Sequence, residues 1–537
     1  NTALGYNSLA SFTTGYQNVM IGAFTGDAIT TGNNNTALGY GALSAEDTGT
    51  RNVAIGNEAL NVLNYDGAGY NVAVGHRAGY ALTTGTVNTF LGGFAGGATD
   101  DGTRNVALGY AAMDTGNAGD DNIAIGYGAL QDTTASSNIA IGSSAMIQHT
   151  TGARNIAIGH AAMDDTDAGS NSLGSSDNIF IGYNAGGGTW ADVASIQNVV
   201  IGNNSADASF SGANYNVGMG TNVYGALTQG DANSAFGHGS LTALTTGGSN
   251  VAVGNAAGST MTGTSNTVLI GSGAGNAINS TDANGTVAIG YEASYNLTSG
   301  ANQVSIGYQA GKALTTAANS TFIGYQAGLV HTGGNNIAIG DRAFYDTDAG
   351  ASSLASTKNV AIGNRALAGT LTDAAVVGTV ALGYYALGNA TMGGIDYNIA
   401  IGMESQMANA GGQNIAIGYA TLKVADGGET GNIAIGTSTM DAVNNDGSDH
   451  NVAVGNYSLR GGTGLLARNI AIGHQSMDGT GTVDGSDNIF MGYQAGSGTW
   501  TTAASNRNVS VGNYTMDSAL DGALDNTCLL YTSPSPR

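Results

Sequence analysis

The strongest constraint on the fold is a short repeat that runs through the chain. The unit Asn-x-Ala-Ile/Leu-Gly appears at 1–5, returns at 35–39 and 52–56, and recurs with small changes at 71–75 and onward to 508–512. We count about 29 units in 537 residues, most often 17 residues apart and within a range of 16 to 23. Because self-similarity at a fixed period marks a repeat architecture, the chain is not expected to divide into ordinary globular domains.

Each unit has two parts and a loop. The first part, with Asn35, Ala37, Leu38 and Gly39 as an example, has a β-branched second residue in every unit but that of Ser234. Such residues favour pleated backbone and glycine permits a turn, so this part predicts a strand. The second part, x-x-Ala/Ser-Leu/Met/Gly, is long enough for one further short strand. We therefore predict an all-β fold, a parallel β-solenoid or β-roll of about 29 coils of 16–23 residues, since helical repeats need longer units.

A volume exchange indicates which residues face inward. The third strand position is usually Ala, and the fourth residue after the glycine is then usually Leu or Met. Six units carry a large third residue, and all six have glycine at the other position. These pairs are Met20 with Gly26, Phe90 with Gly96, Phe180 with Gly186, Leu269 with Gly275, Phe322 with Gly328, and Phe490 with Gly496. Close packing requires such compensation between touching side chains, so we expect the two positions to meet inside the coil. Two pairs, Ala73 with Gly79 and Ala252 with Gly258, leave space and do not fit this rule.

This facing has a consequence for assembly. Positions two and four of a strand point opposite to position three, so a Val/Ile stripe is expected along the outside. Strands that are apolar on both faces are normally covered on both. We therefore predict that two further copies of the chain cover the stripe, which gives a homotrimeric rod. The alternative is a monomeric solenoid with the reverse facing, Val and Ile inside and Ala outside.

The opening Asn is expected to stack into a ladder whose amides bond from coil to coil. A few units carry another polar residue there, which keeps a hydrogen-bonding column. These residues are Thr267, Thr286, Gln303, Ser320 and Thr379.

Charge and composition exclude some partners. The formal net charge is -24, so the surface repels phosphate backbones and nucleic-acid binding is not expected. No stretch approaches the apolar length of a membrane span.

The repeat shaft is expected to span residues 1–516, with 153–205 duplicated as a block at 467–515, each copy carrying one tryptophan. Residues 517–537 look like a truncated repeat followed by a non-native tail, because Cys528 and both prolines lie there.

The motif Asn-Ser/Thr-Val/Ala-Ala-Ile/Leu-Gly-x-x-Ala/Ser resembles the head repeats of trimeric autotransporter adhesins. The longer form at 1–17 is also similar to repeats of phage and viral tail fibres. The adhesin resemblance implies a left-handed parallel β-roll in a homotrimer. The chain departs from it in its longer coils and loops, and stalk heptads, an anchor and a chaperone domain are expected to lie in terminal parts outside these 537 residues, if at all.

Acidic loops and one aromatic column are the candidate binding features. Clustered carboxylates can bind Ca²⁺, although the same residues favour solvated Asx turns. The candidate residues are Asp164, Asp165, Asp167, Asp346, Asp348, Asp446, Asp449, Asp484 and Asp487. Tyr follows the repeat glycine in about eleven units, where the rings either stack on sugars or pack from coil to coil. His76, His160, His238 and His474 share that column, and three such His around an axis are a second metal hypothesis.

No unique catalytic constellation is present and no cofactor motif, so we do not expect an enzyme. We predict an extracellular structural fibre or filament shaft at a cell or virion surface. The alternative is an adhesin whose loops bind a host glycan or a protein receptor. Ice binding is a third possibility, but it needs a regular Thr-x-Thr face, and the Thr-Thr-Gly loops are irregular.

Overall fold

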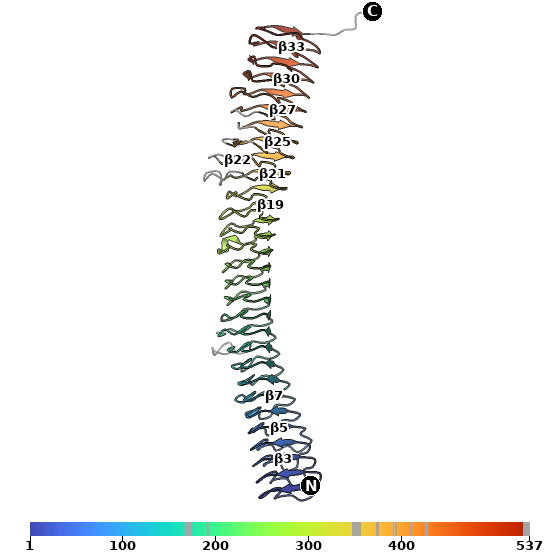
Figure 1. Ribbon diagram of the computed structural model, residues 1–537, viewed down its shortest axis with the longest axis vertical. Helices are drawn as coiled ribbons and strands as arrows, with labels where there is room; N and C mark the ends of the chain where they lie inside the picture. Colours follow the sequence, from blue (N-terminus) through green and yellow to red (C-terminus); the bar gives the residue numbers. More distant parts are fainter. Residues whose placement is uncertain are drawn as a thin grey trace, which may run out of the picture. The chain divides into compact units, whose positions relative to one another are not determined.

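The computed structural model describes residues 1–166, 174–190, 193–345, 356–371, 375–389, 391–392, 395–408, 411–424 and 428–529. Of residues 370–371 and 391–392 it describes the backbone only. The chain divides into two compact units, residues 1–267 and 268–537. Figure 1 shows short strands stacked through each unit, among them β3, β5 and β7 in the first.

Each strand of unit 1 has three residues, and from β1 to β15 each pairs in parallel with its neighbours within the unit. The strands are β1 (Thr2–Leu4), β2 (Val19–Ile21), β3 (Thr36–Leu38), β4 (Val53–Ile55), β5 (Val72–Val74), β6 (Thr89–Leu91), β7 (Val106–Leu108), β8 (Ile123–Ile125), β9 (Ile139–Ile141), β10 (Ile156–Ile158), β11 (Ile179–Ile181), β12 (Val199–Ile201), β13 (Val217–Met219), β14 (Ser234–Phe236) and β15 (Val251–Val253).

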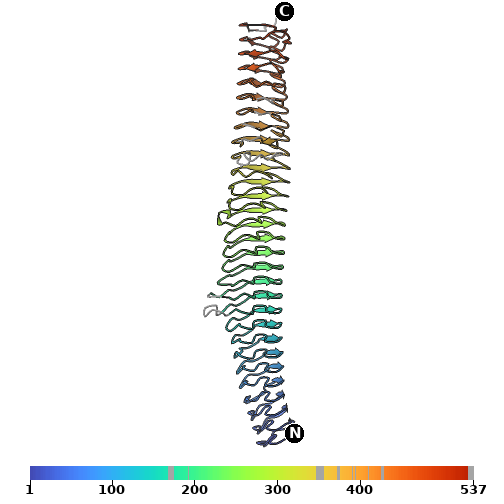
Figure 2. The ribbon, with the colours of Figure 1, turned by 60° about the vertical axis from the view of Figure 1, so that its left-hand side comes forward.

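Unit 2 repeats the arrangement, and Figure 2 shows the strands of each unit stacked in one column. Its column contains β16 (Val268–Ile270), β17 (Val287–Ile289), β18 (Val304–Ile306), β19 (Thr321–Ile323), β20 (Ile337–Ile339), β21 (Val360–Ile362), β23 (Val380–Leu382), β25 (Ile399–Ile401), β26 (Ile415–Ile417), β27 (Ile433–Ile435), β28 (Val452–Val454), β30 (Ile470–Ile472), β32 (Ile489–Met491), β33 (Val509–Val511) and β34 (Thr527–Leu529). Two additional strand pairs lie in its loops. These are β22 (Thr370–Leu371) with β24 (Thr391–Met392), and β29 (Leu466–Ala467) with β31 (Gly485–Ser486).

The register of the ladder is the same from coil to coil, because position two always pairs with position two of the next coil. Thr36 of β3 pairs with Val53 of β4, and Val53 pairs with Val72 of β5. The only helix in the described residues is the 3-10 turn η1 (Thr281–Ala283). The prediction of an all-β parallel solenoid of about 29 coils is therefore confirmed.

The segment after the repeat glycine is not the second strand that its length predicts. It is a series of turns in which the second and fourth residues have positive φ, as at Glu58 (φ 55°) and Leu60 (φ 47°). The backbone still bonds from coil to coil: the N–H of Glu58 donates to Tyr40 O (2.8 Å), and the N–H of Leu60 donates to Ala78 O (3.0 Å). These contacts satisfy the peptide groups without an extended strand. The prediction of two strands per coil is wrong for this reason.

The repeat glycine itself allows no other residue. Gly56 has a φ of 138°, and a Cβ placed on it would lie 2.2 Å from the carbonyl oxygen of Gly75 in the next coil. Both the backbone conformation and the close approach of the coils require glycine here.

The predicted inward facing is confirmed. The central strand residue is buried in almost every coil, while its two neighbours are half-buried or exposed, as in β4 and β8. The fourth residue after the glycine, such as Leu43, is also buried. A Cβ added to Gly186 would lie 2.7 Å from the ring of Phe180. The corresponding contact between Gly328 and Phe322 is 2.9 Å, and between Gly496 and Phe490 it is 2.5 Å.

The space at Ala73 and Gly79 is filled from the neighbouring coils. A Cβ on Gly79 would lie 2.8 Å from Leu60 of the preceding coil and 2.9 Å from Phe90 of the following one. In the coil of β13 the exchange is reversed: the third strand residue is Gly218, and the large side chain is Tyr224 at the fourth position after the glycine. A Cβ on Gly218 would lie 2.8 Å from the buried ring of Tyr224. The core is therefore compensated between coils as well as within them.

The tryptophans of the duplicated blocks are buried in the core next to the phenylalanine at the third strand position. Trp190 is fully buried, stacks on Phe210 at 5.0 Å and donates its indole N–H to Gly186 O (3.0 Å). Trp500 is likewise buried, with its ring 6.3 Å from that of Phe490. The two blocks thus place their tryptophans in equivalent positions.

The predicted asparagine ladder is confirmed. The side-chain oxygen of Asn35 accepts the backbone N–H of Asn52 (2.9 Å), and Asn35 Nδ2 donates to Gly49 O (2.8 Å). Thr267 keeps the column because its hydroxyl donates to Asn250 Oδ1 (2.8 Å). Thr379 donates its hydroxyl to Ile395 O (2.9 Å).

The end of the described chain follows the same ladder. Thr527–Leu529, which contains Cys528, forms β34 and pairs with β33. The prolines of the expected tail lie outside the described residues.

Candidate functional site

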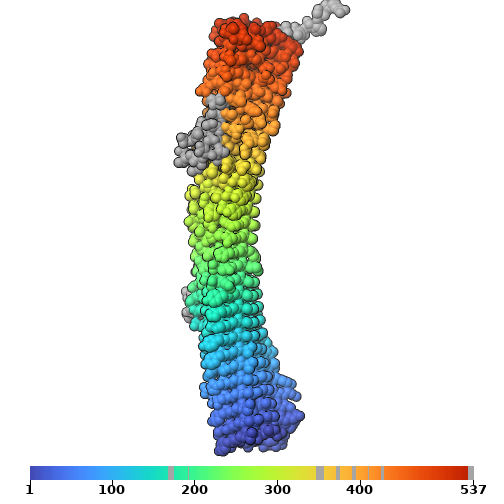
Figure 3. All heavy atoms as spheres, viewed as in Figure 1, coloured from blue at the N-terminus to red at the C-terminus, as the bar shows by residue number. Residues whose placement is uncertain are grey.

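The outer strand face, formed by positions two and four of the strands, is apolar and uncovered in the single chain. Leu38 and Leu91 are 45% and 44% exposed, and Met219 is 50% exposed. The same face continues in unit 2 through residues such as Ile337 and Ile435, which are also exposed. The predicted outward Val/Ile stripe is therefore present in each unit. Figure 3 shows one side of unit 1 with all its atoms. On that side, equivalent atoms of successive coils form rows.

The tyrosine column directly follows the strands in sequence. Tyr291, Tyr308 and Tyr325 stack in consecutive coils, with ring centroids 5.3 Å apart and interplanar angles of 15° and 11°. The rings remain 42–46% exposed. Packing from coil to coil is confirmed, and the outer edges of the rings stay accessible to a ligand.

The histidines of this column pack in the same way. His160 stacks on Tyr183 at 5.4 Å, and His474 stacks on Tyr493 at 5.4 Å. His76 meets Phe94 edge to face at 5.1 Å. Within the described residues of this one chain, no group of three or more His, Cys, Asp or Glu side chains is arranged to hold a metal ion.

Several candidate calcium-binding carboxylates accept hydrogen bonds from the neighbouring coil. Asp165 accepts the hydroxyl of Thr189 (2.9 Å). Asp449 accepts the N–H of Thr430 (2.6 Å) and Asp484 accepts that of Leu465 (2.8 Å).

The remaining candidate carboxylates differ from one another in their surroundings. Asp487 pairs with Arg468 at 2.7 Å, and that guanidinium lowers the pKa of its carboxyl group. Burial raises the pKa of Asp164, whereas Asp446 is exposed. Asp167, Asp346 and Asp348 lie outside the described residues.

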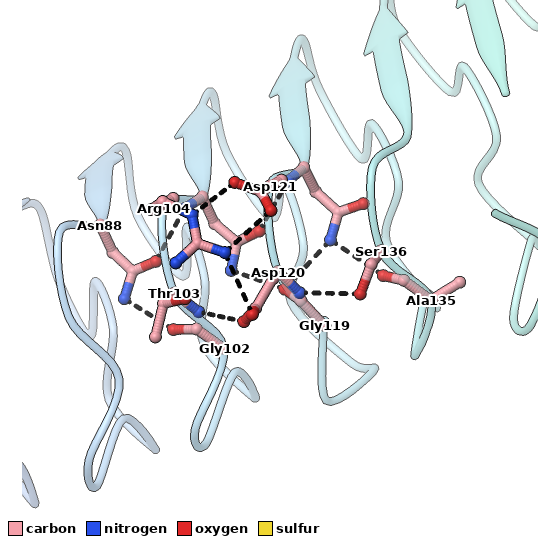
Figure 4. Close-up of polar contacts among 11 residues, drawn as sticks. Asn88, Gly102, Thr103, Arg104, Gly119, Asp120, Asp121, Ala135 and Ser136 are labelled. Carbon is pink, nitrogen blue, oxygen red and sulfur yellow. Dashed lines mark hydrogen bonds and ion pairs between the residues drawn. The ribbon is translucent and has the colours of Figure 1, made fainter. Parts of the chain in front are cut away.

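Asp449 belongs to an acceptor column that sequence reasoning missed, two residues before the ladder asparagine. In Figure 4, Asp120 accepts the N–H of Thr103 (2.8 Å), and its own N–H donates to the hydroxyl of Ser136 (3.0 Å). Arg104 pairs with Asp121 at 2.6 Å beside them. The signal was the recurrence of Asp, Asn or Ser at this position, which bonds one loop to the next.

A cavity of about 410 Å³ lies in unit 2 and was not predicted. Arg342, Tyr345 and Arg365 line it together with the small residues Ala368 and Gly388. It lies away from the strand positions, on residues that the repeat motif does not specify.

The described residues include no helix with the length and apolar character that a bilayer crossing requires. Comparison with models of known protein families finds no match, and comparison with curated proteins finds none either. The fold defines the class of this chain, a parallel β-solenoid compatible with β-roll repeat proteins.

Proposed function

We propose that the chain is the shaft of an extracellular fibre, in which three identical copies pack through their outer strand faces. The observation that carries this proposal is the continuous apolar face of each unit, which one chain leaves exposed. Exposed apolar patches of this extent mark interaction surfaces or lead to aggregation. Identical copies suit the face because its residues recur with the coil spacing, so parallel copies keep equivalent coils level around a symmetry axis.

A shaft role agrees with the distribution of the side chains. Each coil is bonded to its neighbours through a backbone ladder and a buried asparagine column, which supports stiffness along the stack. The recurring residues serve packing and coil contacts, so the proposal includes no catalytic activity. A surface with a net charge of -24 does not favour nucleic acid as a partner.

The test is the mass of the purified chain in solution. A homotrimer gives three times the chain mass of 53.1 kDa by light scattering or sedimentation. Ile337→Lys and Ile435→Lys place charges on the outer strand face and are expected to dissociate it. Thr316→Lys, in an exposed loop position, is the matched control and leaves the trimer intact. A monomeric wild-type chain with its strand face exposed would refute the proposal.

An adhesin is the second candidate function, and the accessible tyrosine column is the observation that favours it. The outer edges and hydroxyl groups of consecutive rings such as Tyr308 and Tyr325 form a repeated accessible row that a glycan can contact. If the purified chain binds glycans on an array, and Tyr308→Ala and Tyr325→Ala lose that binding, the adhesin role is supported. Absence of glycan binding together with a trimeric mass supports the shaft alone.

A further inference from the structure

The cavity of unit 2 contains two arginines at equivalent positions of consecutive coils. Arg342 follows Gly340 by two residues, and Arg365 follows Gly363 by two residues. Their coils are directly bonded, since the N–H of Arg365 donates to Asp341 O (2.9 Å). Like charges at directly opposed positions of neighbouring strands repel each other. The two coils therefore carry neighbouring positive side chains, of which Arg342 also donates to Gln326 (3.3 Å).

Most other described arginines are paired with carboxylates in the adjacent coil, with the exception of Arg51, which lies over Tyr70. Arg77 holds Glu58 at 2.6 Å in the same column, and Arg154 and Arg507 each hold an aspartate at 2.6 Å. By contrast, the nearest described carboxylate to Arg342 is that of Asp341 at 4.0 Å. Arg365 has no ion pair with any described carboxylate, and its guanidinium donates to the hydroxyl of Tyr385.

Aromatic rings hold the two guanidinium groups in place. Arg342 lies over Tyr325 at 5.2 Å and over Tyr345 at 5.8 Å. Arg365 lies over Tyr385 at 5.4 Å. Stacked guanidiniums lose little freedom when an oxyanion binds, and their planar N–H groups match a carboxylate, sulfate or phosphate.

The hollow itself arises from a loss of side-chain volume across three coils. The fifth residue after the glycine is Tyr345, then Ala368, then Gly388, whereas the coils on either side carry Leu329 and Met407. A side chain at Gly388 is also disfavoured, because its Cβ would lie 2.7 Å from the backbone of Tyr385. A volume of about 410 Å³ lies within the range of small-ligand pockets, ~300–1000 Å³.

We propose that this cavity binds a small ligand through a carboxylate, sulfate or phosphate group, and that an acidic sugar is the class of ligand that fits it. The anion lies between Arg342 and Arg365 and accepts hydrogen bonds from both guanidinium groups. The neutral part of the ligand occupies the space above Ala368, where Asn389 supplies polar contacts at the rim. This site does not depend on the shaft role, since none of its residues belongs to the outer strand face.

The experiment titrates the full chain at low ionic strength with glucuronate, glucose 6-sulfate, glucose 6-phosphate and glucose, followed by calorimetry or ligand-observed NMR. At least one charged sugar is expected to bind, and glucose is not. The charged probe that binds most tightly identifies the anion. The double variant with Arg342→Gln and Arg365→Gln is expected to weaken binding at least about ten-fold. Ala368→Phe, which fills the hollow and keeps both charges, is expected to abolish it.

Arg468→Gln removes a more exposed arginine from an ion pair outside the cavity and is expected to leave the affinity unchanged. Circular dichroism and the solution mass verify that each variant is folded and assembled. Without ligand at low salt, Arg365→Gln is expected to raise the thermal midpoint, because it relieves the repulsion. Equal binding of glucose, unchanged affinity in the double variant, or no binding of any charged probe at about 10 mM would overturn the proposal. None of these results bears on the trimer.

Discussion

The ring of Phe90 fills the space in which a side chain at Gly96 would lie, six residues later in the same coil. A Cβ on Gly96 would be 2.6 Å from the Phe90 ring. In the next coil the volumes are exchanged, with Ala107 in the strand and Met113 at the turn, both fully buried. One coil interior therefore accepts one large side chain from either of two positions.

We expect Gly96→Leu alone to destabilise the protein by about 3 kcal/mol, because the new side chain overlaps Phe90. Phe90→Ala alone costs about 3–5 kcal/mol through the cavity that it leaves. The double variant reproduces the combination of the neighbouring coil and is expected to recover most of both losses. The positive φ of Gly96 is no obstacle, because Met113 adopts a φ of 54° at the equivalent position. Chemical denaturation of the three variants measures the coupling, and additive losses would contradict the shared interior.

Asn105 is a position at which the contribution of the asparagine ladder to stability can be measured. Its Oδ1 accepts the N–H of Asn122 (2.9 Å), and its Nδ2 donates to Gly119 O (2.8 Å). Asn105→Leu leaves the buried N–H of Asn122 without a partner, while Gly119 O keeps a bond from Asn122 Nδ2, so we expect a loss of about 1–3 kcal/mol. Asn105→Thr is expected to cost less, since Thr267 keeps the column elsewhere. Native-state hydrogen exchange of the Asn122 amide is the measurement, and equal exchange in both variants would argue against the ladder.

The buried side chain of Glu46 is expected to make the stability of its coil depend on pH. Its side chain is buried in a column that neighbouring coils fill with Ile29 and Leu63, and burial raises its pKa from 4.5 to about 7. The folded state thus binds a proton more tightly than the unfolded state. Its contribution to stability is complete below pH 4.5 and is lost as the pH rises to 7, a fall of about 3 kcal/mol. Glu46→Gln should remove this fall.

The measurement is exchange of the Gly49 amide, which donates to the Glu46 carboxyl group at 2.6 Å. Wild type and Glu46→Gln should protect it similarly at pH 4, and the variant should protect it better at pH 8. Glu58→Gln, which breaks the ion pair with Arg77, serves as the control for loss of a surface charge. Identical pH profiles for wild type and Glu46→Gln would disprove the prediction.

At His331 we expect the opposite pH dependence, with stability lost as the pH falls. It is buried in the same column, stacks on Phe344 at 3.7 Å, and has its pKa lowered by burial to about 3. The unfolded state then binds more protons below pH 6.5, so stability is lost as the pH falls from 6.5 toward 3. Leu314 occupies the equivalent position one coil earlier, so His331→Leu should fit and should stabilise the protein by about 2 kcal/mol at pH 5. Thermal unfolding at pH 5 and pH 8 tests this, with exposed His238→Leu as control. An equal shift at both pH values would contradict it.

The sequence predicted the parts of the fold that depend on recurring side-chain volume and polarity. The Ala-to-Phe exchange at positions such as Phe90 placed the interior correctly, and the polar column placed the ladder. The turn segment was missed because Leu60 and Met113 are residue types that normally avoid positive φ. Glycines in the same columns, such as Gly41 with φ 61° and Gly96 with φ 63°, were the available signal.

The cavity was missed for a different reason. It depends on Ala368 and Gly388 departing from the neighbouring coils at a position that carries no consensus residue, and on two arginines that are unremarkable one at a time. Only the stacking of coils shows that Arg342 and Arg365 belong together. A repeat motif describes what the coils share, whereas a binding site depends on where they differ.

The backbone hydrogen bonds between coils run along the stacking direction, and this determines how the chain responds to tension. A pull on one end of a unit loads the bonds of the last coil first, while the coils behind it stay intact. Release of one 17-residue coil adds roughly 55 Å of extended chain. A single stretched unit is therefore expected to lengthen in a series of small, similar steps and to absorb work at each one, as a tether that yields gradually under load.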